Sequence, residues 1–275
     1  MTLTSRSLLK TDKDLRLFAQ LMQRNGFPRT LQQMRWQYAR EAGTDLASQV
    51  LQDTEAPDGS IRASYGLMPQ RMVIDGKSAI GAQTVDVMTD EDLRGKGLYL
   101  RLASQAYRRA EQNGITLVFG FPNPDAARGY FGPLKWTKVS SVPFLIRPMR
   151  SRFIFSQIHP AFTRLPDLAI PRVGVGWRGG LVLREFDSFD GRHENVWKQV
   201  ASGIGVAVDR TSNYLNWRLR DRPLVRYVSC QAELQDRVVG YVTVALQEKH
   251  GGRTGYLMEL LTLPESRGVS GSLVH

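Results

Sequence analysis

The chain has 275 residues, of which 42% are hydrophobic and 23% are charged, as in a globular protein, and its formal net charge is +11. No apolar run is long enough to span a membrane, charges enter the N-terminus too early for a signal peptide, and Cys230 is the single cysteine. These features exclude an internal disulfide and a cysteine cluster for a metal, and they lead us to expect a cytoplasmic protein.

Helices and strands alternate in the first part of the chain. Apolar periodicity predicts helices over Asp12–Arg24, which ends at Asn25-Gly26, and over Thr30–Glu41. Runs of β-forming residues, separated by turn residues, predict strands over Ser48–Asp53, Ser60–Pro69 and Arg71–Ile74.

The stretch from Gln83 to Trp136 is the most informative. Alternation of apolar and polar residues predicts a strand over Gln83–Thr89. The helix predicted after it has apolar residues at every fourth position and ends at Asn113-Gly114. The turn between them is Arg94-Gly95-Lys96-Gly97-Leu98-Tyr99. Its glycines let the backbone approach an anion, and the helix N-terminus attracts negative charge. The turn therefore suits a pyrophosphate.

Two other phosphate-binding motifs do not fit this turn. Lys96 is not followed by Ser or Thr, as a Walker A loop requires, and Leu100 stands where a dinucleotide fingerprint needs glycine. Taken alone, these few residues also fit an ordinary tight turn in an α/β domain. The apolar strand Ile115–Phe121 and a short helix ending in an aromatic residue follow.

The ordered set resembles the GNAT superfamily of acyl-CoA-dependent N-acyltransferases. Val87-Met88-Thr89 is similar to the strand end whose backbone pairs with the pantetheine arm, and Arg94-Gly95-Lys96-Gly97 is similar to the start of the pyrophosphate turn. Asn123 follows Phe121-Pro122 at the next strand end, where the family commonly has an Asn near CoA. Leu134-Lys135-Trp136 resembles the family's Leu-Gly-Phe. Tyr99 and Lys135 depart from the pattern, because the family has a small residue at the first position and Gly at the second.

The resemblance implies acetyl-CoA as the acyl donor and no metal. The cofactor-binding residues that it implies are Val87, Met88, Thr89, Arg94, Gly95, Lys96, Gly97, Leu98, Tyr99 and Asn123. The fold that it implies is α/β, a mixed sheet flanked by helices, followed by a second, partial GNAT-like module.

The expected domains are a GNAT N-acetyltransferase domain over residues 1–148, a proline-rich linker over 149–183 and a partial, degenerate GNAT-like domain over 184–275. Lys138–Ile146 is expected to be the late strand of the first domain. Residues of the second half echo the first, which suggests a tandem, duplicated protein of bacterial type, although a coincidence of β-rich sequence remains open. The echoes are Tyr214–Arg220 with Met34–Arg40, Val238–Leu246 with Arg62–Met68, and Leu257–Gly268 with Thr84–Gly95.

The second copy is expected to stop before its helix forms, either truncated or completed by a partner. Its turn, Arg267–Ser272, lacks the lysine and the second glycine in register. We therefore expect one CoA site per chain, in the first domain, with the second domain forming one wall of the acceptor cleft.

Two residues are candidates for acid–base chemistry. Gln83 stands where many members of the family have a glutamate base, so Asp86 on the same strand is the candidate base, although strict alternation places it on the opposite face. A strand carboxylate bonded to polar neighbours is the alternative for Asp86. Phe131 occupies the position of the family's proton-donating Tyr, so its neighbour Tyr130 is the candidate acid, with core packing as the alternative. The four histidines lack metal-ligand spacing.

The function that the resemblance implies is acyl-CoA-dependent N-acetyl transfer to an amine of a small molecule, with an amino sugar as one acceptor. No nucleic acid is involved in this reading, and the sequence does not indicate the oligomeric state. Two alternatives remain open: a Fem-type aminoacyl transferase that uses tRNA, which the charge of +11 would suit, and a non-catalytic CoA-binding or interaction protein of GNAT fold.

Overall fold

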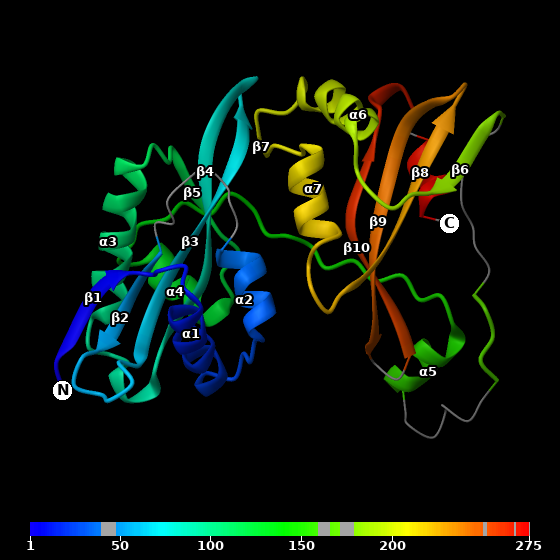
Figure 1. The fold of residues 1–275 in the computed structure, drawn as a ribbon. Helices are drawn as coiled ribbons and strands as arrows, with labels where there is room; N and C mark the ends of the chain where they lie inside the picture. Colours follow the sequence, from blue (N-terminus) through cyan, green and yellow to red (C-terminus); the bar gives the residue numbers. More distant parts are fainter. Residues whose placement is uncertain (40–47, 159–165, 171–178, 250–251, 267, 275) are drawn as a thin grey trace. The chain divides into compact units, whose positions relative to one another are not determined.

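The computed structural model describes residues 1–39, 48–158, 166–170, 179–249, 252–266 and 268–274. The chain divides into two compact units, of which the first comprises Met1–Val139 with Gly205–Asp209 and the second comprises Ser140–Ile204 with Arg210–His275 (Figure 1). The segment 205–209 therefore belongs to the first unit although the second unit precedes and follows it in sequence.

The first unit is a mixed α/β structure. Its elements are β1 (Leu3–Ser7), α1 (Asp12–Arg24), α2 (Leu31–Tyr38), β2 (Gln49–Asp53), β3 (Ile61–Ile74), β4 (Lys77–Thr89), the 3₁₀ turn η1 (Glu91–Leu93), α3 (Leu98–Gln112), β5 (Leu117–Phe119), α4 (Pro124–Phe131) and β7 (Val206–Val208).

Six strands among the described residues form the sheet of this unit, in the order β1-β2-β3-β4-β5 with β7 paired to β3. Neighbours are antiparallel except for β4 and β5, which run parallel because α3 connects them. The expected mixed sheet is confirmed, and the strand after α3 lies beside the strand before it.

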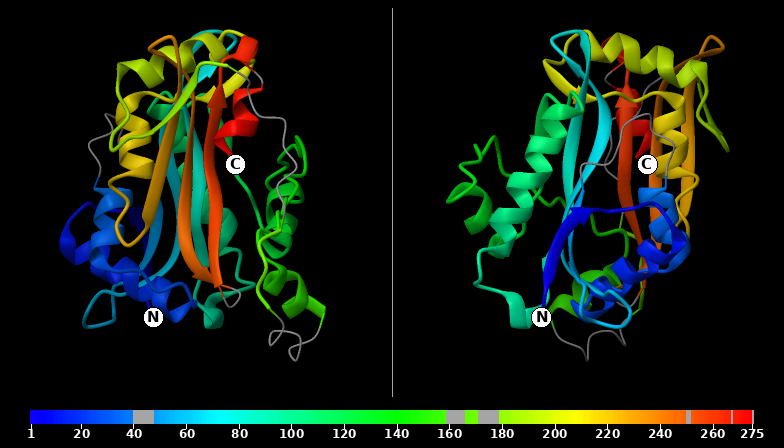
Figure 2. Two further views of the ribbon diagram at one scale, coloured as in Figure 1. Left: turned by 90° about the vertical axis from the view of Figure 1, so that its right-hand side faces the viewer. Right: turned by 60° about the vertical axis from the view of Figure 1, so that its left-hand side comes forward.

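Helices cover both faces of this sheet. In the right-hand view of Figure 2, α3 lies against one face and α1 against the other. Leu51 and Tyr65 pack with Leu102 and Ala106 of α3, whereas Val50, the neighbour of Leu51, packs with α1 and α2. This alternation follows from the twofold side-chain period of a strand.

Two expectations about strands were wrong. The expected strands Ser60–Pro69 and Arg71–Ile74 form one strand, β3, across Pro69. Among the described residues, β3 has no strand partner on the side away from β4 between Tyr65 and Met72, so a residue without an N–H fits there. The expected late strand Lys138–Ile146 is not a strand; the segment has irregular backbone, Pro143 lies within it, and Phe144 is 80% exposed.

The second unit contains a separate sheet with the strand order β10-β9-β8-β6, four strands in the part of the chain that is described. Its elements are α5 (Ser151–Ile158), β6 (Leu181–Glu185), α6 (Gly191–Ala201), α7 (Ser212–Leu219), β8 (Arg226–Leu234), β9 (Arg237–Lys249), β10 (Gly252–Thr262), the 3₁₀ turn η3 (Pro264–Ser266) and α8 (Val269–Leu273).

The order of these elements from β6 to α8 repeats the order from β1 to α3 in the first unit, apart from the insertion of β7. A bulge also interrupts β10 between Leu257 and Glu259, as one interrupts the pairing of β3 and β4. The expectation that the chain stops before a helix is wrong, since α8 forms a short helix after Gly268. Gly268 has a right-handed helical conformation, with φ −67°.

No helix in the described ranges has the length and apolar character needed to cross a membrane. Likewise, the described side chains include no group of three or more His, Cys, Asp or Glu residues that could hold a metal ion.

Candidate functional site

Strands β4 and β5 are paired only over a short register, from Gly81–Leu117 to Gln83–Phe119. The pairing ends at Gln83, and beyond it the side of β4 away from β3 has no strand partner among the described residues. Gly120, just after β5, is required by close packing, because a Cβ there would lie 2.2 Å from Oγ1 of Thr84. The rest of β4 therefore has a strand edge that is open to pairing.

A pocket of about 340 Å³ lies along this edge of β4. It brings together five residues that the sequence analysis selected, Asp86, Val87, Met88, Asn123 and Tyr130, from β4, the end of β5 and α4. The remaining lining residues are Phe27, Arg29, Thr84, Val85, Phe121, Pro122 and Ala126. Most of these side chains are apolar, and a few polar groups converge among them, as in ligand sites generally.

Asp86 occupies the bulge of β4, with φ 49° and a register shift opposite Ser64 and Gly66. The bulge overturns the strict alternation expected for Asp86, so the carboxylate reaches α2. It accepts hydrogen bonds from Arg29 at 3.0 Å, from Gln37 at 2.6 Å and from the Tyr38 hydroxyl. Burial, reinforced by this carboxylate, raises the pKa of Tyr38. The carboxylate of Asp86 is thus occupied by three donors.

Tyr130 is the other candidate, and aromatic rings fix its position. Its ring makes edge contacts with Trp136, at 4.6 Å between centroids, and with Tyr99, at 6.1 Å. Gly129 is required beside Tyr99, because a Cβ there would lie 2.9 Å from the Tyr99 ring. Tyr99, which replaces the family's small residue, therefore has a packing role on the side of α4.

Tyr130 belongs to a group of packed aromatic rings that includes three further tyrosines, Tyr65, Tyr99 and Tyr107. The hydroxyls of Tyr65 and Tyr107 are hydrogen-bonded, and the Trp136 indole donates to Tyr107 at 3.0 Å. The Tyr99 hydroxyl is buried and has no hydrogen-bond partner among the described residues. Burial is the main reason that the pKa values of Tyr65, Tyr99 and Tyr107 are raised, so these three hydroxyls stay neutral.

The glycine turn has the geometry that an anion needs. Gly95 and Gly97 have φ values of 75° and 73°, and nothing lies within 4 Å of a Cβ built on either. Gly97 is the N-cap of α3 and no side chain caps that end of the helix. The turn is exposed, and the first N–H groups of a helix have no intrahelical acceptor. A pyrophosphate would fit this open, uncapped and positively charged end.

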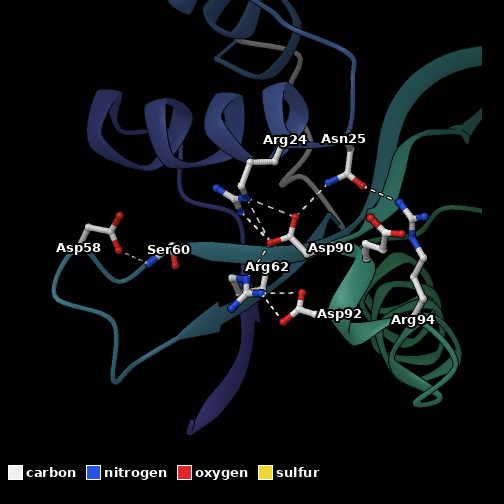
Figure 3. Close-up of a pocket in the computed structure, with 9 residues that line it drawn as sticks. Arg24, Asn25, Asp58, Ser60, Arg62, Asp90, Asp92 and Arg94 are labelled. Carbon is white, nitrogen blue, oxygen red and sulfur yellow. Dashed lines mark hydrogen bonds and ion pairs between the residues drawn. The ribbon is translucent and has the colours of Figure 1, made fainter.

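Arg94 opens the turn and also lines a polar hollow of about 450 Å³ (Figure 3). Its Nε donates to the carbonyl of Thr89 at 3.1 Å, and its Nη2 donates to Oδ1 of Asn25 at 3.1 Å. Thr89 is the last residue of β4, so Arg94 ties the strand end to the turn. The six other residues predicted to bind the cofactor line neither hollow; they are Thr89, Gly95, Lys96, Gly97, Leu98 and Tyr99.

Asn123 has a second, structural task. Its Oδ1 accepts a hydrogen bond from the N–H of Ala126 at 2.8 Å, which makes it the N-cap of α4. Lys135, where the family has glycine, has a φ of 52°, a left-handed conformation that glycine favours.

Sequence reasoning missed the pocket residues Phe27 and Arg29, which lie between α1 and α2, and also missed Asn25 and Asp90 beside Arg94. Phe27 is 62% exposed, and neither Phe27 nor Arg29 stands in a periodic pattern. A charged residue in a loop gives no local signal of its distant partner. An Arg in the loop before an apolar helix could at most have been marked as a candidate.

Residues 9–138 match the model of a protein family described as the acetyltransferase (GNAT) domain. A comparison with curated protein sequences found no match.

Solved structures resemble the chain in fold over nearly its full length. A GCN5-related N-acetyltransferase from Anabaena variabilis is 11% identical, with a TM-score of 0.63 over 99% of this chain and 61% of that one. A probable N-acyltransferase from Enterococcus faecalis is 13% identical, with a TM-score of 0.61 over 99% of this chain and 62% of that one. N-myristoyltransferase from Saccharomyces cerevisiae, solved with bound myristoyl-CoA, is 12% identical, with a TM-score of 0.55 over 94% and 66%.

The chain therefore spans less than two thirds of the length of each of these proteins. At such low identities the likeness concerns the fold.

Proposed function

We propose that this chain transfers an acetyl group from acetyl-CoA to an amine of a small molecule, a proposal that the match of residues 9–138 to the GNAT acetyltransferase model supports. The observation that carries the proposal is the pocket along the edge of β4 beyond Gln83, where the pairing of β4 with β5 ends. The glycine turn directly follows that edge in sequence.

The backbone of the turn, with Arg94 and Lys96, would hold the pyrophosphate of CoA. Residues Val87–Thr89 on the free edge of β4 would hydrogen-bond the amides of the pantetheine arm, as an added strand pairs with a sheet edge. Leu98, Tyr99 and Asn123 would surround the same ligand. When bound, acetyl-CoA supplies an activated acyl group as a thioester.

Tyr130 would donate its proton to the departing sulfur, since it lines the pocket and its ring is held on two sides. The proposal gives Asp86 a different task from that of a base. Its three donors hold the carboxylate in place, and an amine proton would pass to water instead. Rate enhancement would then come chiefly from positioning of the two substrates.

The acceptor is proposed only as an amine of a small molecule, with an amino sugar among those to be tested. The pocket also contains Phe27 and Phe121, which are 62% and 70% exposed. An amine with an apolar body would bury these rings, so aromatic and alkyl amines belong in the same panel.

Isothermal titration with acetyl-CoA tests the proposal most directly. We expect one CoA per chain, because Gly95 and Gly97 before α3 have positive φ, whereas Gly268 before α8 is right-handed. Arg94→Ala should weaken binding by about 1–3 kcal/mol, as for other charge-assisted contacts with phosphate.

The other outcomes of the titration are also informative. No binding at millimolar acetyl-CoA would end the enzyme proposal. If tRNA then bound in a salt-sensitive way, the Fem-type alternative would replace it. If CoA bound but no amine of a broad panel were acetylated, the chain would be a non-catalytic CoA-binding protein, which the occupied carboxylate of Asp86 would explain.

A further inference from the structure

A network of polar side chains surrounds Asp90, the residue that follows β4. Asp90 is buried, and its carboxylate accepts hydrogen bonds from Arg24 of α1, at 2.9 Å, and from Arg62 of β3, at 2.7 Å. Arg62 also pairs with Asp92 at 2.8 Å, and this contact lowers the pKa of Asp92. The carboxylate of Asp90 is therefore fixed from two elements at once (Figure 3).

Asn25 connects this network to the glycine turn. Its side-chain amide donates to Oδ1 of Asp90 at 3.0 Å and to the carbonyl of Leu21 at 3.0 Å. Both amide hydrogens thus have acceptors, which leaves Oδ1 directed at Arg94. The amide orientation follows from these partners, because the reverse orientation would place Oδ1 against two acceptors and the NH₂ group against a donor.

Arg94 keeps donors for a ligand after these contacts. A guanidinium has five N–H donors. One is directed to Thr89 and one to Asn25, so the other three are available to an anion. The two contacts also restrict the rotamers of a long side chain that is otherwise exposed.

We infer that Asn25, held by Asp90, is a positioning residue that orients Arg94 toward the pyrophosphate of CoA. The inference rests on the proposed function. It assigns a binding role to the C-terminus of α1, which lies outside the glycine turn in sequence. A guanidinium that is oriented in advance loses less rotamer freedom when the anion binds. The contact with Asn25 should therefore increase the affinity for CoA.

The chain offers a matched control. Asn113 is the C-cap of α3 as Asn25 is the C-cap of α1, and each is followed by a glycine of positive φ. The Asn113 side chain donates to the carbonyl of Arg109 at 2.8 Å, as the Asn25 side chain donates to that of Leu21. Only Asn25 contacts Arg94, so the two residues share the capping role and differ in the proposed one.

The experiment compares coenzyme A dissociation constants, by isothermal titration, for the full chain and four variants: Asn25→Ala, Asn113→Ala, Arg94→Ala and the Asn25→Ala/Arg94→Ala double variant. We expect Asn25→Ala to raise Kd roughly five- to twentyfold, as loss of a contact to a charged group does. Asn113→Ala should leave Kd unchanged while destabilising the chain to a similar degree in urea. In the Arg94→Ala background, Asn25→Ala should change Kd less than twofold.

Arg94→Lys, alone and combined with Asn25→Ala, provides a second measurement. Lysine keeps the charge but lacks the planar fork that reaches Thr89 and Asn25 together, so its Kd should be raised and should not respond to Asn25→Ala. Equal Kd values for Asn25→Ala and the unchanged chain would overturn the inference alone, as would additive effects with Arg94→Ala. Failure of the unchanged chain to bind coenzyme A would overturn the proposed function and this inference with it.

Discussion

Two glycines, Gly97 and Gly114, mark the two ends of α3. Both have positive φ, 73° and 71°, and both have open space where a Cβ would be. A side chain at either position costs about 1–2 kcal/mol of backbone strain. The two positions are therefore matched in conformation and differ in the end of the helix that they occupy.

Valine at each position separates strain from ligand contact. We expect Gly97→Val and Gly114→Val to lower the free energy of unfolding by similar amounts in urea titrations. Only Gly97→Val should abolish acetyl-CoA binding, because a side chain there blocks approach of the phosphates to the backbone. Retention of wild-type affinity by Gly97→Val would remove the turn from the proposed site.

The hydroxyls of Tyr99 and Tyr107 form another informative pair. That of Tyr99 is buried and has no partner in the described part of the chain, whereas that of Tyr107 bonds both Tyr65 and the Trp136 indole. Tyr99→Phe should stabilise the chain by about 1 kcal/mol, because it removes an unsatisfied buried group. Tyr107→Phe should destabilise it by about 1–3 kcal/mol, because it leaves two partners unpaired. Thermal unfolding of both variants checks the difference in sign.

At the scale of elements, α6 begins with a pH-sensitive cap. His193 is fully buried; its Nδ1 accepts a hydrogen bond from the N–H of Asp190 at 3.1 Å, and its Nε2 lies 3.0 Å from Oε1 of Gln231. Burial lowers the pKa of His193, and the neighbouring Asp190 carboxylate acts in the opposite sense but more weakly. The folded state therefore favours the neutral ring.

The consequence is a loss of stability in mild acid. As pH falls below the unfolded pKa of about 6.5, the unfolded state binds a proton that the folded state resists, so the free energy of unfolding should decline until pH passes the lower folded pKa. His193→Gln keeps a side-chain acceptor for the Asp190 N–H and should flatten this decline. Urea titrations from pH 7.5 to pH 5 measure both slopes. Equal slopes in the two chains would rule out His193 as the source.

Local patterns predicted the elements whose signals lie within a few residues. The helix Asp12–Arg24 was predicted with the bounds of α1, and the expected end of α3 at Asn113-Gly114 is confirmed. The expected strand Lys138–Ile146 failed because apolar residues alone do not supply a neighbouring edge. A strand is defined by its partner, which local sequence does not contain.

The candidate site divides in the same way. The turn and the strand end were found from glycines and spacing, whereas the environment of Asp86 depends on Arg29, Gln37 and Tyr38, far from it in sequence. A bulge at Asp86 also shifted the side-chain alternation, and the sequence of this strand contains no signal that predicts the bulge. Long-range pairing and local irregularity thus account for what the sequence could not predict.

At the scale of the whole molecule, β7 is the element that joins the two halves of the sequence. It pairs antiparallel with β3, Ala207 opposite Val73, and the ends of this pairing are held by backbone hydrogen bonds of Asp75 to Gly205 and of Asp209 to Arg71. The sheet of the first unit, which contains the matched range 9–138, is therefore completed by residues outside that range.

Proline at position 207 tests this contribution in the full chain. Ala207→Pro removes a backbone N–H and restricts φ within a short strand, so we expect a loss of about 1–3 kcal/mol in unfolding free energy. Val206→Thr keeps β-branching and the N–H at a residue that is 52% exposed, and should be close to neutral. Equal stabilities for these two variants would show that β7 adds little to the sheet.

The position of β7 also has a consequence for folding during synthesis. On the ribosome, β3 is complete long before residue 206 is added. Met72–Ile74 therefore lack their partner strand, β7, while the intervening segment is translated. Over that interval the nascent chain carries a free strand edge that another chain could pair with. Pairing of β7 with β3 is thus a late, non-local step in folding, which slows maturation of the chain. At high rates of synthesis the free edge of β3 would need protection from pairing with other chains.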